Sequence, residues 1–340
     1  MNYDTDQIQK QILLNEFNTT VKEKIQQIRN LYIKYKKNPN TQLHKNYSDK
    51  YPFLKKKDRY PSYKDILNII KPTFDEEKIK IITEHYGSKI QGFFKHGQTN
   101  KTGLSNTKIL DNVLNLNHLS ICVTKNILES QNQWSERLLK DLKKKTSQEL
   151  KNIILIISST TNDLNGNATH CKTIHKAISK IMTGNFKIIF MCSNRRRFND
   201  ILHLLEVYPN MGTLKQLPIE VIHDEAHNRD EGIPSKRAIV DNIILSPYIM
   251  SYTPVTASYE TIIDSNNPLW LKNNLDKYSI NYTNVCTITS SDINYSSIKD
   301  AHTIKWDQIS NNNNYTPYQI SQFDTELFDH YDAFNYNNYK

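Results

Sequence analysis

The sequence predicts an α/β fold in which a parallel sheet is covered by helices on both faces. Between residues 89 and 260, six short apolar runs alternate with longer amphipathic segments. This alternation is typical of βαβ units, which build parallel sheets. Residues 1–88 show a helical period instead, and residues 261–340 show no regular period. We therefore expect an N-terminal helical extension, a three-layer sheet domain and an irregular C-terminal tail.

Residues 1–88 are expected to form a basic helical region. Apolar residues recur there at helical spacing, namely Leu13, Phe17, Val21, Ile25, Ile28 and Tyr32. Two shorter helices are expected at residues 62–70 and 74–87. Ser62 and Asp75 stand at their starts and are residue types that favour the N-cap position.

The sheet domain is expected to begin at residue 89, where strand-like runs replace the helical period. The runs are KIQGFF (89–94), LSICVT (119–124), NIILIISS (152–159), FKIIFMCS (186–193), IEVIHDEAH (219–227) and YIMSYTPVTAS (248–258). In open parallel sheets, ligands bind outside the carboxyl ends of the strands. The residues at the end of each run are therefore the first candidates for a functional site.

Charge and cysteine content narrow the classes of function. The formal net charge is +9 and the pI is about 9.1, which favours a polyanionic partner but also fits a solvated basic surface. The four cysteines are Cys122, Cys171, Cys192 and Cys286. They form no CxxC pair, so neither a zinc site nor a disulfide framework is expected.

The sequence also carries signals about location. Its first residues contain no apolar signal region, and no apolar run reaches the roughly 18 residues that span a membrane. We therefore expect a cytoplasmic protein that is not secreted and does not enter a membrane. The chain has 20 Tyr and only 8 Gly, a bias that resembles the products of AT-rich genomes such as those of giant DNA viruses. For a viral protein, the expected location becomes the virus factory or the virion.

Two acids stand at the end of one predicted strand. Ile219, Val221 and Ile222 would form the buried strand, and Asp224 and Glu225 would emerge at its carboxyl end. In a site that cleaves phosphate bonds, a first acid helps to hold Mg²⁺ and a second polarises the attacking water. The alternative is an exposed acidic turn without a chemical role.

At this point the sequence resembles the first RecA-like domain of superfamily 2, DEAH-type, helicases and translocases. The resemblance covers residues 89–259. VIHDEAH looks like the Walker B motif, and TPVTAS is similar to the Ser/Thr-Ala-Thr motif one strand later. The strand LSICVT and the helix after it resemble motif Ia, and IIFMCSNRRRF resembles the region of motif Ib.

The resemblance implies a three-layer RecA-like P-loop NTPase fold, with ATP and Mg²⁺ as ligands and DNA or RNA as partner. It assigns Asp224 and Glu225 to catalysis, with Asp224 also on the metal. The residues implied in coupling are His227, Thr256 and Ser258, and those implied in nucleic-acid contact are Arg195, Arg196 and Arg197. A surface charge cluster is the alternative for the arginines, and helix packing is the preferred interpretation of Trp134.

Two stretches compete for the phosphate loop, which ordinarily reads G-x-x-x-x-G-K-[ST]. KHGQTNKT (95–102) follows the first strand, opens a helix and has Lys95 and Asn100 in place of the two glycines. The residues that it assigns to the nucleotide are Gly97, Thr99, Lys101 and Thr102, with Thr102 also on the metal. GNATHCKT (166–173) offers Lys172 instead, but it comes after motif Ia, against the order of the family. We favour Lys101.

A helicase motor needs two RecA-like domains, and only about 80 residues follow Ser258. The chain is therefore interpreted as the ATP-binding half of a helicase, either truncated or dependent on a separate protein that carries the second domain. Two further hypotheses stay open. One is a degenerate module that binds nucleic acid or a protein without ATP turnover, and the other is a nuclease using Asp224, Glu225 and Asp230.

Overall fold

The computed structural model describes most of the first 256 residues and one later strand. The described ranges are 2–37, 42–55, 60–90, 92–94, 101–125, 128–147, 149–210, 217–226, 234–256 and 285–287. The chain divides into two compact units. The first holds the described residues of Met1–Ile90 and Arg229–Ser246, and the second those of Gln91–Asn228, Pro247–Ile262 and Ile280–Lys340.

The first unit is helical. Its elements are α1 (Asn2–Lys36), α2 (Gln42–Lys50), the short turn η1 (Pro52–Lys55), α3 (Tyr63–Ile70), α4 (Glu76–Ser88) and α9 (Pro234–Ile244). The apolar stripe of α1 buries Phe17, whose ring lies 6.3 Å from that of Phe74 and 5.5 Å from that of Tyr86. The predicted N-terminal helical extension is thus confirmed.

Both predicted caps are present in this unit. The Ser62 hydroxyl accepts a hydrogen bond from the backbone N–H of Asp65, whose carboxylate accepts one from the N–H of Ser62. At the start of α4, the Asp75 carboxylate accepts a hydrogen bond from the backbone N–H of Lys78. Such caps satisfy N–H groups that have no partner within the helix.

Helix α9 belongs to the helical unit, although in sequence it follows the strand that bears the acids. The Asp241 carboxylate accepts from the backbone N–H of Tyr63 at 2.9 Å, and the Asn242 amide donates to the Pro61 carbonyl at 2.7 Å. These contacts join α9 to the start of α3. The unit is therefore discontinuous in sequence, unlike the division into residues 1–88 and 89–260 that the sequence predicts.

Lys89, at the end of α4, contacts the segment after α9 and makes a pH-dependent contribution to the free energy of unfolding. Its ammonium donates to the carbonyl of Ser246 at 3.0 Å and lies 4.8 Å from the centre of the Tyr86 ring. Burial lowers the pKa of Lys89 from 10.5 to about 8. Between those two pH values the unfolded chain holds a proton that the folded chain has released. Raising the pH through this window therefore favours the folded state.

We predict that the wild type gains about 1–2 kcal/mol of unfolding free energy between about pH 7.5 and pH 9.5, relative to a Lys89→Met variant. The variant lacks the titrating group, so the gain should vanish in it. Urea unfolding followed by circular dichroism at both pH values measures the difference. Parallel pH curves for the two proteins would contradict the prediction.

The second unit is built on a parallel sheet, as the sequence predicts. The described strands are β1 (Gly92–Phe94), β2 (Leu119–Thr124), β3 (Ile154–Ile157), β4 (Thr169–Cys171), β5 (Ile188–Cys192), β6 (Ile219–Asp224), β7 (Ile249–Thr256) and β8 (Val285–Thr287). Their order across the sheet is β4-β3-β5-β2-β6-β7-β1-β8, and each neighbouring pair is parallel. Each of the six predicted runs contains one strand, and β4 and β8 are additional.

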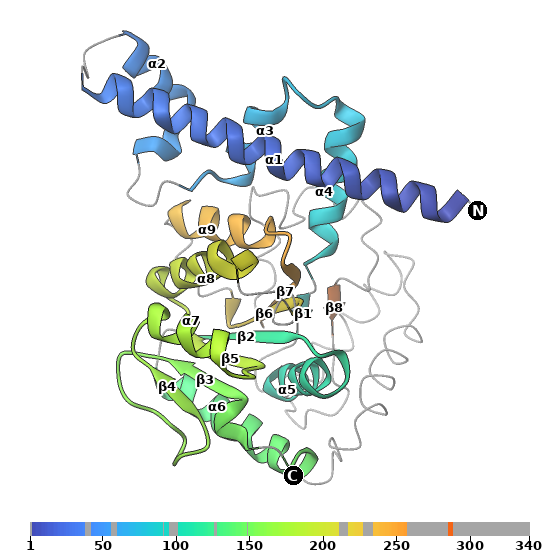
Figure 1. Ribbon diagram of the computed structural model, residues 1–340, viewed down its shortest axis with the longest axis vertical. Coiled ribbons are helices and arrows are strands. Elements are labelled where there is room, and N and C mark those ends of the chain that lie inside the picture. Colours follow the sequence, from blue (N-terminus) through green and yellow to red (C-terminus); the bar gives the residue numbers. More distant parts are fainter. Residues whose placement is uncertain are drawn as a thin grey trace, which may run out of the picture. The chain divides into compact units, whose positions relative to one another are not determined.

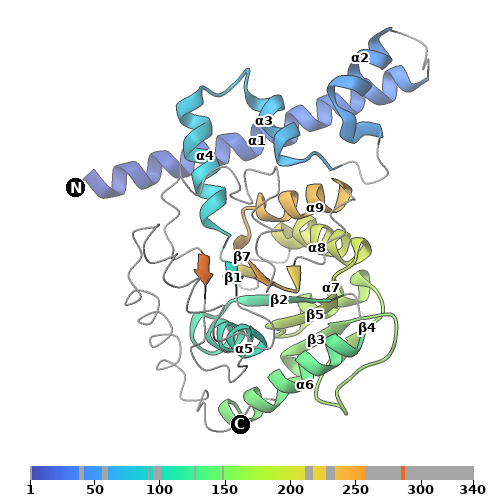
Figure 2. The same ribbon diagram turned by 180° about the vertical axis from the view of Figure 1, so that it is seen from behind.

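Helices cover both faces of this sheet (Figures 1 and 2). The bounds are α5 (Lys101–Asp111), α6 (Leu128–Lys145), α7 (Ile174–Thr183) and α8 (Arg195–Val207), with short turns η2 (Asn112–Leu116), η3 (Leu150–Asn152) and η4 (Tyr208–Asn210). Trp134 of α6 packs edge-to-face on Phe190, with ring centres 5.6 Å apart, and Phe198 of α8 packs against His223. The three-layer α/β fold is thereby confirmed.

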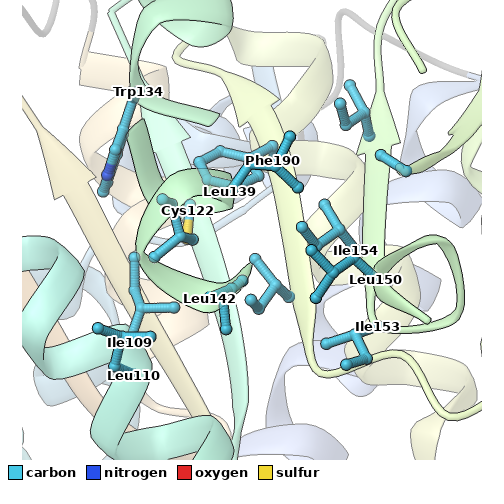
Figure 3. Packing of buried hydrophobic residues seen from close by; sticks show 14 of the residues in the cluster. Ile109, Leu110, Cys122, Trp134, Leu139, Leu142, Leu150, Ile153, Ile154 and Phe190 are labelled. Atoms are coloured by element: carbon cyan, nitrogen blue, oxygen red, sulfur yellow. The ribbon is translucent and has the colours of Figure 1, made fainter. Parts of the chain in front are cut away.

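The face under α5 and α6 holds a large apolar core (Figure 3). Trp134 is 3% exposed, and its indole N–H donates to the Asn106 side-chain oxygen at 2.8 Å. Helix packing is therefore the structural role of this tryptophan. Cys122 and Phe190 point from neighbouring strands β2 and β5 into the same core.

At the amino end of β6, Glu220 is buried in an ion-pair network. Its carboxylate lies 2.7 Å from the Lys108 ammonium of α5 and 2.7 Å from Nδ1 of His118, and it accepts from the Ser251 hydroxyl at 2.8 Å. Burial alone raises the pKa of Glu220, but the charge of Lys108 and these hydrogen bonds together leave the pKa below its usual value. This cluster ties α5, β6 and β7 together at the edge opposite the two acids.

Candidate functional site

Three neighbouring strands end together at the carboxyl edge of the sheet. Asp224, the last residue of β6, is in register with Val255 of β7. Val255 is in turn in register with Phe93 of β1, and Thr256 with Phe94. Because parallel strands point the same way, the ends of β6, β7 and β1 share one edge, with β7 in the middle. This is the place where open parallel sheets bind ligands.

The chain leaves β1 toward helix α5, which begins at Lys101. Residues 95–100, which include Gly97 and Thr99, lie outside the described residues, as does the side chain of Lys101. Thr102, on the first turn of α5, is half-buried. The described elements on either side of this stretch are a strand and a helix, which is the setting that a phosphate loop needs.

The competing stretch has a different setting. Thr169–Cys171 forms the edge strand β4, and Thr173 caps α7 by accepting from the N–H of Lys176. Three strands separate β4 from β6, and one separates β1 from β6. At about 4.8 Å per strand, β4 lies roughly 19 Å from β6 and β1 roughly 10 Å from it. Exposed Lys172 is therefore far from the acids.

Asp224 lies on the same face of the sheet as α5. Successive side chains of a strand point to opposite faces, and His223 contacts Phe198 of α8. Asp224 must then point to the other face, where Val255, its partner in register, belongs to the core formed with α5 and α6. The first acid and the start of α5 therefore lie on the same side of the sheet.

Glu225 has an unusual backbone conformation. Its φ is 50°, in the left-handed region, which side chains other than glycine, asparagine and aspartate rarely adopt. The conformation costs roughly 1–2 kcal/mol for an L-residue. Backbone strain of this kind clusters at ligand sites, where the surrounding structure holds it in place. The left-handed conformation of Glu225 changes the direction of the chain at the end of β6. Asp224 and Glu225 are both half-buried there.

The residues implied in coupling are only partly placed. Thr256 ends β7 at the same edge as Asp224. His227 and Ser258 lie outside the described residues, and so does Asp230, the third acid of the nuclease hypothesis. Within the described part of the chain, no group of three or more His, Cys, Asp or Glu side chains is arranged to hold a metal ion.

The arginines follow strand β5 at the start of α8. The Asn194 side chain caps this helix by accepting from the N–H of Arg197 at 3.0 Å. Arg195 is half-buried and Arg196 is exposed. Arg197 is only 5% exposed, and its guanidinium pairs with Asp200 at 2.7 Å. Of the three, only Arg196 is exposed, whereas Arg197 is held inside the fold.

One strand of the site carries a buried hydroxyl without a partner. Thr253 of β7 is fully buried, and its Oγ1 has no hydrogen-bond partner among the residues that the structure describes. A buried hydroxyl in this state costs about 1–3 kcal/mol. The adjoining residues of β7 lead directly to Val255 and Thr256.

We predict that Thr253→Val raises the unfolding free energy by about 1 kcal/mol or more, because valine fills the same space without a polar atom. The urea-unfolding midpoint measures it. Thr107→Val is the matched control, since the buried Thr107 hydroxyl donates to the Gly103 carbonyl at 3.1 Å and its loss should not stabilise. A lowered midpoint for Thr253→Val would show that the Thr253 hydroxyl of the wild type has a hydrogen-bond partner.

Sequence reasoning missed the hydrogen bonds of His223, which directly precedes the acids. Its Nε2 lies 3.0 Å from the Ser193 hydroxyl, and its Nδ1 lies 2.7 Å from the Tyr252 hydroxyl. These partners stand 30 and 29 residues away in sequence, so no local spacing reveals them. The signal in the sequence is a histidine that follows the apolar pair Val221 and Ile222 in the strand.

The donor set fits a magnesium nucleotide. Mg²⁺ keeps several waters and substrate phosphate oxygens, so one or two carboxylates and a hydroxyl are sufficient ligands from the protein. Asp224, Glu225 and the start of α5 supply these groups by their position at one edge and, for Asp224, on the same face. The start of α5 also offers backbone N–H groups to phosphate.

No helix among the described residues is both long and apolar enough to cross a membrane. In comparisons with protein-family models, with curated proteins and with solved structures, the chain matches none of them.

Proposed function

We propose that this chain is a helicase-like, nucleic-acid-dependent ATPase domain of superfamily 2 type. It would be the ATP-binding half of a motor that also needs a second RecA-like domain. The observation that carries the proposal is the order β6-β7-β1, whose ends meet in register. In this order only β7 separates the acids of β6 from β1, the strand that leads into Lys101 and Thr102.

The chain's own residues would divide the work as follows. Lys101 and the first N–H groups of α5 would bind the phosphates of ATP, and Thr102 and Asp224 would hold Mg²⁺. Glu225 would orient the attacking water. The metal neutralises charge on the phosphates when it is bound. Positioning and charge stabilisation of this kind account for most of the catalysis of phosphoryl transfer.

The basic charge of the chain supports a nucleic-acid partner, whether DNA or RNA. Arg195 and Arg196 start α8 at the carboxyl edge of the sheet, and lysine and arginine contacts to phosphates supply most non-specific affinity for nucleic acid. The Tyr-rich and Gly-poor composition, which resembles that of products of AT-rich genomes such as those of giant DNA viruses, supports a viral helicase that acts in the virus factory or virion.

A degenerate RecA-like module without turnover is the second candidate. The observation that favours it is the loop sequence, in which Lys95 and Asn100 stand where phosphate loops have glycine. Side chains at these positions restrict the backbone conformations that wrap phosphates. Such a module would bind nucleic acid or a protein through the same basic surface.

Calorimetry with a non-hydrolysable ATP analogue and Mg²⁺ tests the proposal on the wild type, Lys101→Ala and Lys172→Ala. We expect Lys101→Ala to weaken binding at least about tenfold, which corresponds to about 1.4 kcal/mol. Lys172→Ala is the matched control and should bind like the wild type. Loss only with Lys172→Ala would move the phosphate site to β4. A wild type that does not bind would leave the degenerate module.

A further inference from the structure

We propose that His223 is a positioning residue that couples the start of α8 to the acids at the end of β6. This inference rests on the proposed function, and it gives a role to buried groups that the proposed chemistry does not use. The groups are Ser193, His223 and Tyr252, which are 9%, 0% and 0% exposed.

The three side chains form a continuous hydrogen-bond network across the sheet. The Ser193 hydroxyl lies 3.0 Å from Nε2 of His223, and Nδ1 of His223 lies 2.7 Å from the Tyr252 hydroxyl. Ser193 follows β5, His223 belongs to β6 and Tyr252 to β7. This network therefore reaches from β5 across β2 and β6 to β7, on the face of the sheet opposite α5, and it includes the residue that precedes Asp224.

Both nitrogens of the His223 ring are engaged, which fixes the ring in place. A neutral imidazole has one donor and one acceptor nitrogen, and a hydroxyl can serve either. Phe198 packs against the same ring with centres 5.3 Å apart. The ring thus acts by holding its neighbours in position and not as a base or a metal ligand.

Two of the residues that contact His223, Ser193 and Phe198, lie at the start of α8. Ser193 directly precedes Asn194, which caps that helix, and Phe198 lies on its first turns. Arg195 and Arg196 stand between them. A polyanion that binds exposed Arg196 would shift the start of α8, and with it the contacts of Ser193 and Phe198 with the ring.

The other end of the coupling is the strained turn after β6. Glu225 stands two residues after His223 and keeps a φ of 50°. A conformation of that energy persists only where surrounding contacts hold the backbone. The fixed His223 ring supplies such contacts on β6, so a shift at α8 would change the position of Asp224 and Glu225. Binding of a polyanion and binding of a magnesium nucleotide would then influence each other, as linkage requires.

The test measures this mutual influence directly. The dissociation constant of a fluorescent non-hydrolysable ATP analogue with Mg²⁺ is measured for the full chain, with and without a saturating short oligothymidylate. The ratio of the two constants is the coupling factor. We expect a factor of about fivefold or more in the wild type. Ser193→Ala and Tyr252→Phe should each bring it to within about twofold of one.

Ser158→Ala is the matched control. The Ser158 hydroxyl lies 3.1 Å from Nε2 of His170 in a partly buried Ser–His pair, at the end of β3 and away from β6. This variant should keep the wild-type factor. Thermal unfolding of every variant separates the roles, because a merely structural role would lower the melting temperature and leave the factor unchanged.

Three outcomes would overturn the proposal. A wild type that binds both probes with a factor of one has no coupling to explain, and variants that keep the wild-type factor show that His223 does not carry it. In both cases the proposed function survives. A wild type that fails to bind the nucleotide overturns the proposed function as well, so the two failures are distinguishable.

Discussion

Replacing Lys108 by methionine should lower the unfolding free energy by about 3–5 kcal/mol, the largest stability effect that we expect in this protein. The Lys108 ammonium lies 2.7 Å from the Glu220 carboxylate, and the two side chains are 16% and 5% exposed. Without the lysine, a buried carboxylate loses the charge that offsets its burial. Urea unfolding of the full chain, followed by circular dichroism, measures the loss.

The pH dependence of this effect has a definite sign. In the wild type the pKa of Glu220 is lowered, so its contribution is present above the usual carboxyl pKa and is lost as the pH falls through the folded value. In Lys108→Met we expect burial to raise the pKa of Glu220. Lowering the pH then protonates the buried carboxylate, which removes its unpaired charge and stabilises the variant. The difference between the two proteins should shrink as the pH falls from about 7 to about 5.

Two further variants check the cause. Lys108→Met combined with Glu220→Leu removes both charges and should recover most of the loss. Lys151→Met removes one partner of an exposed pair, in which the Lys151 ammonium lies 3.3 Å from Glu149, and should leave the midpoint nearly unchanged. A Lys108→Met loss that is equal at both pH values would show that packing, and not charge, is responsible.

Glu225→Gln should reduce ATP hydrolysis by about 10²–10⁴-fold, the largest effect on activity that we expect, because the amide cannot take up a proton from the attacking water. Binding of Mg-ATP should stay close to that of the wild type, since the first acid and the start of α5 are unchanged. Single-turnover hydrolysis with nucleic acid present measures the first quantity, and calorimetry the second.

The control for this prediction is Glu206→Gln, which changes an exposed carboxylate near the end of α8. It should hydrolyse ATP like the wild type. Undiminished hydrolysis by Glu225→Gln would remove this residue from the chemistry and return the DEAH stretch to an acidic turn. Lost binding together with lost hydrolysis would indicate that the glutamate supports the fold of the site.

The sequence predicts the main strands of the sheet because their apolar runs are long enough to show a pattern. Strand β4, Thr169–Cys171, is polar as well as short, and it lies inside the stretch that competes for the phosphate loop, so no apolar run marks it. Placing Thr169–Cys171 at the edge of the sheet requires its pairing with β3, which no local pattern contains.

Long-range partners explain the rest of what the sequence leaves open. Glu220 reads as one polar residue in an apolar strand, and its partner His118 stands 102 residues away. Arg197 reads as one of three surface arginines, yet the turn of α8 brings Asp200 beneath it. The acids at the end of β6 are visible in the sequence because strand and motif coincide there. The hydrogen bonds of His223 with Ser193 and Tyr252 cannot be predicted from the sequence, because these residues come from the ends or interiors of three different strands.

The discontinuous helical unit has a consequence for synthesis on the ribosome. Its N-terminal helices emerge early, but Tyr63 and Lys89 must wait for Asp241 and Ser246, which are translated about 150 residues after Lys89. At roughly 5–20 residues per second, the wait is on the order of 10–30 s. During this interval the helical unit lacks α9, so the surfaces of α3 that α9 contacts stay uncovered until residue 244 has been translated.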